Sequence, residues 1–133
     1  MDPMPAPERL RLPEHRSRRL GLLGLSAFFV AAGVNHFVNP SFYVAIMPPF
    51  VPAHLTLVYV SGAFEVLGGL SVLVPRLRSV AGWALVGLLL AVFPANIHMA
   101  LNPELFPDVS PIVLYVRLPL QLLLMGWAVW ATR

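Results

Sequence analysis

Residues 53–74 read AHLTLVYVSGAFEVLGGLSVLV, an apolar run that contains a single charged residue, Glu65, near its middle. A helix rises about 1.5 Å per residue, so a run of about 20 residues crosses the roughly 30 Å of hydrocarbon in a bilayer. A carboxyl group at that depth is costly unless it is paired, hydrated or functional. The run therefore predicts a membrane helix, with Glu65 as the first candidate for a functional residue.

Three further apolar runs, residues 20–38, 80–101 and 112–131, predict three more membrane spans and contain only one charged residue, Arg117. Of the 133 residues, 58% are hydrophobic and 11% are charged, and the mean hydropathy is +0.77. These values exceed what a soluble domain of this length needs to bury a core. The predicted fold class is an all-α membrane protein, in which residues 20–133 form a four-transmembrane-helix bundle.

The segments outside the spans predict a tail and one short helix. Residues 1–19 hold four prolines and five arginines and predict a disordered or interfacial basic tail. Asn39-Pro40-Ser41 predicts a turn, and residues 42–47 predict a short interfacial helix that Pro48-Pro49 would end. A proline inside each of the last two spans predicts a bend, because proline lacks a backbone donor.

The placement of the arginines predicts the orientation. Five arginines precede the first span, two lie between the second and third, and one ends the chain, whereas the other two connections contain no Arg or Lys. By the positive-inside rule we expect both termini in the cytoplasm. The basic residues are then topology signals and not a nucleic-acid surface. A cleaved secretory signal is the alternative for the first run, but its apolar character continues to Val38.

Polar side chains inside the spans gather in the half away from the basic termini. Asn35 and His36 close the first span and Asn96 closes the third, whereas Glu65 and Arg117 lie on helices that enter from outside. Helical side chains lean toward the N-terminus of their own helix, so the two sets converge at one depth. We expect Glu65 and Arg117 to meet there as an ion pair. The predicted polar, ligand-binding pocket comprises Glu65, Arg117, Asn96, His36, Asn35, Gln121 and Ser61.

The same contacts could serve only to hold the helices together, contributing roughly 0.6–2 kcal/mol each. We expect no metal site, because no histidine pairs with an acid at helical spacing, and the spacing of His36 and His98 does not support haem ligation. The chain has no cysteine, phosphate loop or nucleophile elbow. No catalytic residue is therefore assigned, and an enzymatic role would be that of a subunit of a membrane oxidoreductase.

The chain contains the segments Asn35-His36-Phe37, Asn39-Pro40, Ile46-Met47-Pro48-Pro49 and residues 61–69 and 93–99, and its last span contains Arg117-Leu118-Pro119-Leu120-Gln121. These segments resemble the DoxX-like family of small bacterial integral membrane proteins. The resemblance extends over about residues 20–130. It implies a four-helix fold in the bacterial cytoplasmic (inner) membrane, in a family where some relatives look like subunits of a thiosulfate:quinone oxidoreductase or accompany detoxification partners.

Three functional hypotheses follow. The first is a membrane subunit or accessory protein of a redox or detoxification system, with an outer-leaflet pocket for a quinone-like or other small amphipathic ligand whose carbonyl Arg117 or His36 would bind. The second is a small-solute or proton-coupled transporter, which the almost wholly apolar inner halves of the spans disfavour. The third is an assembly or scaffold protein with a purely structural Glu65 to Arg117 pair. Expected partners are the lipid bilayer, a redox partner protein and a second copy of the chain.

Overall fold

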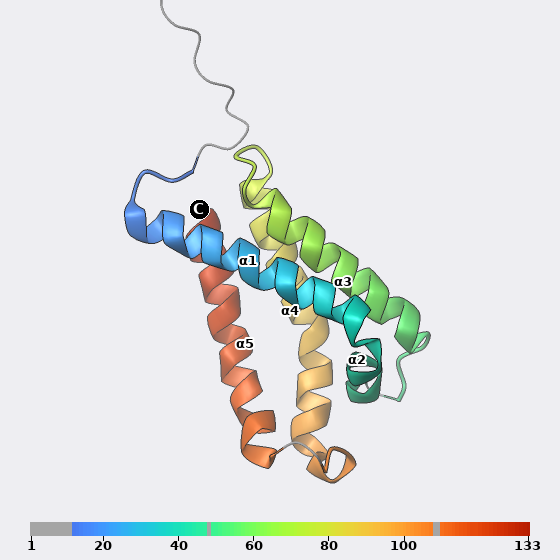
Figure 1. The fold of residues 1–133 in the computed structure, drawn as a ribbon. Coiled ribbons are helices and arrows are strands. Elements are labelled where there is room, and N and C mark those ends of the chain that lie inside the picture. The colour runs from blue at the N-terminus through green and yellow to red at the C-terminus, as the bar shows by residue number, and fades with distance from the viewer. Residues whose placement is uncertain (1–11, 48, 108–109) are drawn as a thin grey trace, which may run out of the picture.

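The computed structural model describes residues 12–47, 49–107 and 110–133, and in these residues all regular secondary structure is helical (Figure 1). Four long helices and one short helix account for the apolar runs and the first connection. A single 3-10 turn lies in the last connection. The elements are α1 (Arg16–Val38), α2 (Pro40–Ile46), α3 (His54–Ser71), α4 (Arg78–Leu101), η2 (Pro103–Leu105) and α5 (Pro111–Thr132).

The helix boundaries differ from the predicted ones mainly at the basic end. α1 begins at Arg16, inside the predicted tail, of which residues 1–11 lie outside the described residues. The first turn of α1 is held to the end of α5, because the Arg18 guanidinium donates to the Trp130 carbonyl at 3.3 Å. α2 begins at Pro40, two residues before the predicted start, since proline suits the first turn of a helix.

Three of the four long helices, α1, α4 and α5, are long and apolar enough to cross a membrane. This agrees with the prediction of a membrane protein. α3 is shorter, with 18 residues, and it carries His54 and Glu65, which lower its hydropathy. α4 and α5 continue without interruption through Pro94 and Pro119.

The long helices form two antiparallel pairs that cross each other. α1 packs along α3, and α4 packs along α5; the first pair crosses obliquely in front of the second (Figure 1). α3 also contacts α4, and α1 contacts α5, so the four helices close a ring. α3 and α5 occupy diagonal positions in this ring, without an extensive contact between them.

Glycines bring the backbones of α1 and α3 into contact. A Cβ atom on Gly33 would lie 2.6 Å from the Gly62 carbonyl oxygen, and one on Gly62 would lie 2.7 Å from His36 Cβ. A Cβ atom on Gly69 would meet Val30 at 3.0 Å, so a second glycine of α3 also lies against α1. Small residues in membrane helices allow this kind of approach.

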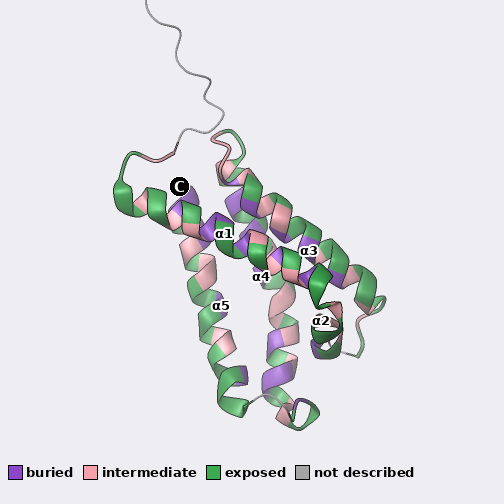
Figure 2. Ribbon diagram, viewed as in Figure 1, coloured by how far each residue is buried: buried purple, intermediate pink, exposed green. Residues whose placement is uncertain are grey.

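Two apolar clusters lie toward the two ends of the molecule. The larger one joins α1, α4 and α5 with Val72, the residue that follows α3, and it contains Leu22, Leu25 and Phe29 of α1. The smaller one, at the other end, contains Ile46 and Leu114 with Tyr43 packed against it. The first half of α5 is largely exposed, as Figure 2 shows, with Leu114 and Gln121 as its buried residues.

Candidate functional site

The glycine contact between α1 and α3 places His36 against Glu65. Each of these residues lies three positions after its glycine, Gly33 or Gly62, and so on the same helix face one turn further on. His36 Nδ1 lies 3.3 Å from Glu65 Oε2. Both residues are buried, each with 9% of its surface exposed. Gly33, His36, Gly62 and Glu65 are called the α1–α3 seam below.

The hydrogen atom on His36 Nδ1 has two acceptors within reach. The Ala32 carbonyl oxygen lies 2.7 Å from this nitrogen, closer than Glu65 Oε2. A carbonyl oxygen only accepts hydrogen bonds, so Nδ1 must carry a hydrogen and donate it to Ala32. Glu65 Oε2 is buried and has no hydrogen-bond partner among the described residues. The carboxyl group therefore faces the imidazole without sharing its principal hydrogen bond.

Tyr43 covers the other side of the His36 ring. The two rings are stacked, with centroids 3.8 Å apart and an interplanar angle of 15°. Asn35 Nδ2 donates to the Tyr43 hydroxyl at 2.7 Å, and Asn39 Nδ2 donates to Asn35 Oδ1 at 2.7 Å. These bonds hold α2 against the end of α1. Sequence reasoning did not place Tyr43 in the pocket, because the contact depends on how α2 folds back.

A cavity of about 360 Å³ lies beside this stack and is called the His36 cavity. His36, Tyr43 and Ser61 are the polar residues that border it. The other walls come from the segment between α2 and α3, from the start of α3 and from one face of α4. These apolar lining residues are Ile46, Met47, Phe50, Val51, Leu57, Val58, Leu88, Ala91, Val92, Pro94 and Ala95.

The expected ion pair between Glu65 and Arg117 is not found, and this prediction was wrong. Glu65 Oε2 faces His36 Nδ1 instead, and in the described part of the chain no hydrogen bond or ion pair involves Arg117. The reason is the diagonal placement of α3 and α5 in the ring. Arg117 is half-buried on α5.

Asn96 and Gln121 form a separate buried contact between α4 and α5. Asn96 Nδ2 donates to Gln121 Oε1, and Gln121 Nε2 donates to the Leu89 carbonyl. Pro94 has no N–H group, so the carbonyl of Leu90, four residues before it, loses its usual helical donor. The Leu89 carbonyl is the one immediately before it. Asn96 Oδ1 has no partner among the described residues. Neither residue lines the His36 cavity.

The seven predicted pocket residues thus fall into four groups. His36 and Ser61 border the cavity. Glu65 and Asn35 do not border it, but each contacts a residue that does: Glu65 contacts His36, and Asn35 donates to Tyr43. The other three lie elsewhere, with Asn96 bonded to Gln121 between α4 and α5 and with Arg117 on α5.

Residues 25–132 match the family model described as Domain of unknown function (DUF8561), and the chain belongs to this family. No curated protein and no solved structure matches the chain. The resemblance to the DoxX-like family stays a prediction.

Proposed function

We propose that this DUF8561 protein is a four-span membrane protein that binds a small amphipathic ring compound of the quinone class in the His36 cavity. The fourth span would be α3, although it is the shortest of the four long helices. Its polar Glu65 faces α1, whereas the exposed large side chains on its other faces are apolar or aromatic. Those include Leu55, Tyr59, Val60, Phe64, Leu67 and Leu70.

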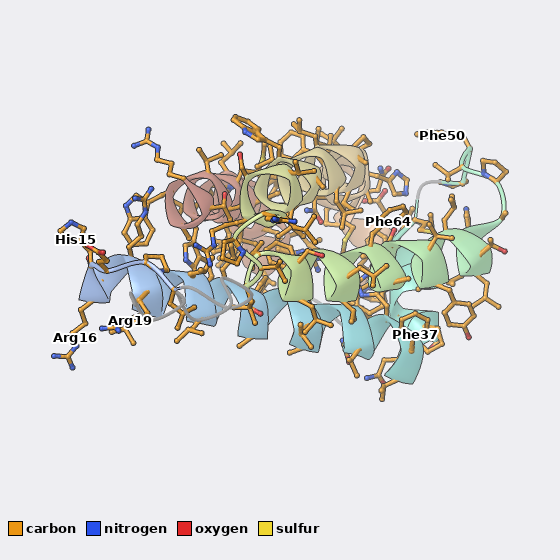
Figure 3. The ribbon with its side chains drawn as sticks, turned by 90° about the horizontal axis from the view of Figure 1, so that it is seen from above. His15, Arg16, Arg19, Phe37, Phe50 and Phe64 are labelled. Atoms are coloured by element: carbon orange, nitrogen blue, oxygen red, sulfur yellow. The ribbon has the colours of Figure 1, made fainter. Side chains whose placement is uncertain are left out.

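The distribution of charged and aromatic residues supports an orientation with both termini in the cytoplasm. Figure 3 shows Arg16 and Arg19 at the start of α1, and Phe37 and Phe50 toward the opposite end of the molecule. Phe50 has 79% of its surface exposed, as expected of a side chain in contact with lipid. Basic residues stay on the cytoplasmic side, which would place the His36 cavity in the outer leaflet of a bacterial inner membrane.

The observation that carries the proposal is the combination of an apolar cavity with a polar group on one wall. Ligand sites are mostly apolar and have a few placed polar groups that fix orientation. A volume of about 360 Å³ lies near the lower end of the usual range of about 300–1,000 Å³. It suits a single substituted ring and is too small for a haem. The stacked His36 and Tyr43 rings offer such a ring a polar edge.

The role of the bound compound is inferred from the resemblance to the DoxX-like family and from the absence of cysteine in the chain. The DoxX-like resemblance favours a subunit or accessory protein of a redox or detoxification system. The chain has no cysteine, so electrons from a dithiol would have to come from a partner protein. We therefore assign ligand binding to this chain and leave any catalytic step to that partner.

The test measures binding to the purified protein in lipid nanodiscs. We expect tert-butylhydroquinone or tert-butylbenzoquinone to raise the melting temperature and to saturate at one site. Ala91→Phe fills the cavity and should weaken binding at least about tenfold, or 1.4 kcal/mol. Ala84→Phe is the matched control, because Ala84 is an exposed alanine on α4 outside the cavity. Equal binding by the two variants, or no binding by the unaltered protein, would refute the proposal.

A further inference from the structure

We infer that the ligand presents a hydroxyl group to His36 Nε2, so the cavity selects the hydroquinone or phenol form of a ring compound over its carbonyl form. This inference rests on the proposed function and names the chemistry of its ligand. It differs from the sequence-based expectation, in which His36 or Arg117 would bind a carbonyl.

The first step is the position of the hydrogen on the imidazole. Nδ1 lies 2.7 Å from the Ala32 carbonyl oxygen and 3.3 Å from Glu65 Oε2. The carbonyl accepts and cannot donate, so the closer contact requires a hydrogen on Nδ1. In a neutral imidazole the other nitrogen, Nε2, is then a hydrogen-bond acceptor.

The second step is that Nε2 is accessible on a ring that borders the cavity. Among the described residues no protein group forms a hydrogen bond with this atom, since the one bond of the ring is made by Nδ1. The buried polar atoms without a partner in this part of the chain are Glu65 Oε2 and Asn96 Oδ1. Nε2 is not one of them, and the His36 ring borders the cavity. A molecule in the cavity can therefore reach an acceptor there.

The third step excludes a doubly protonated ring as the resting form. A charged imidazole would need the ionised Glu65 carboxylate to balance it, because Glu65 Oε2 is the acidic oxygen 3.3 Å from His36 Nδ1. Glu65 Oε2 accepts no hydrogen bond from the described residues, and a buried carboxylate with an unpartnered oxygen is costly. The neutral ring is thus favoured.

The experiment compares three ring compounds that differ only in their oxygen substituents. These are tert-butylhydroquinone, its dimethyl ether and tert-butylbenzoquinone, titrated into the protein in nanodiscs. Of the three compounds, only the hydroquinone can donate a hydroxyl hydrogen to the Nε2 acceptor. We therefore expect its Kd to be about tenfold lower than those of the other two. His36→Phe keeps a ring but removes Nε2, so it should bring the three Kd values together while binding persists.

A second measurement reads the unaltered ring. In ¹⁵N spectra of the histidine-labelled protein, assigned by elimination with His15→Gln, His54→Gln and His98→Gln, we expect Nε2 to be unprotonated at neutral pH. Its signal should move when the hydroquinone is added and stay in place with the dimethyl ether. A protonated Nε2, or equal Kd values for the hydroquinone and the ether, would overturn the inference and leave the cavity proposal standing. Failure of all three compounds to bind would refute the proposed function itself.

Discussion

The carboxyl group of Glu65 contacts one titratable side chain in the described residues, the His36 imidazole at 3.3 Å. Groups in direct contact show interaction free energies of about 0.5–3 kcal/mol in double-mutant cycles, whereas separated groups add within about 0.5 kcal/mol. We therefore predict that Glu65→Gln and His36→Phe are coupled in their effects on the free energy of unfolding. Glu65→Gln and Arg117→Gln should be nearly additive.

Both cycles can be measured by unfolding the protein from mild detergent with increasing SDS. The Glu65 and Arg117 cycle is the control for the His36 cycle, since it uses the same Glu65 substitution and a side chain that lies across the ring of helices. Coupling of Glu65 to Arg117 as strong as its coupling to His36 would contradict the partner assignment.

Residue identity predicts which side chains are out of place in a membrane but not which of them meet. Glu65, Arg117, Asn96 and Gln121 could be singled out because polar groups are rare in spans, and three of these residues are buried. Their partners depend on the rotation and crossing of the helices, which the depth of a residue does not determine. His36 meets Glu65 because α1 is the helix against which α3 packs.

At the scale of the elements, the α1–α3 seam depends on two residues without side chains. A Cβ atom on Gly62 would lie 2.7 Å from His36 Cβ and 2.9 Å from the Gly33 carbonyl oxygen. The helix backbones would have to separate, and overpacking of this kind costs about 1–3 kcal/mol. We predict that Gly62→Ala lowers the free energy of unfolding by this amount and weakens hydroquinone binding by moving His36.

Gly87→Ala and Gly126→Ala are matched controls in α4 and α5, because a Cβ atom on either glycine would meet nothing within 4 Å. Alanine has a higher helix propensity than glycine by about 1 kcal/mol, so these variants should be as stable as the unaltered protein or slightly more stable. Melting curves in one detergent compare all three. A Gly62→Ala variant as stable as the two controls would show that the helices do not touch at the seam.

The existence of the helices could be predicted from apolar run length, whereas their ends depended on contacts between distant segments. α1 extends back to Arg16 where Arg18 bonds to Trp130, 112 residues along the chain. α3 ends at Ser71, and Arg78 Nε donates to the Val72 carbonyl just beyond that end at 2.8 Å. Tyr43 stacks on His36 because α2 folds back along α1 and α3, and no local pattern encodes that return.

At the scale of the whole molecule, the chain offers a direct test of its orientation, because it contains no cysteine and any introduced thiol is unique. Ser110 and Ser79 are exposed serines just before α5 and near the start of α4. Residue 79 lies near the start of α4, and residue 110 lies beyond the other end of α4, where the connection to α5 finishes. If both termini are cytoplasmic, a thiol at residue 110 faces outward and one at residue 79 faces the cytoplasm.

We predict that a membrane-impermeant maleimide labels Ser110→Cys in intact bacterial spheroplasts and labels Ser79→Cys only after the membrane is permeabilised. Ser41→Cys, an exposed position in α2, provides an independent check and should follow Ser110→Cys, because α2 and the start of α5 share the apolar cluster of Ile46 and Leu114. The reverse labelling pattern would invert the topology and move the His36 cavity to the inner leaflet. Labelling of all three positions from outside would show that the helices between them do not cross the membrane.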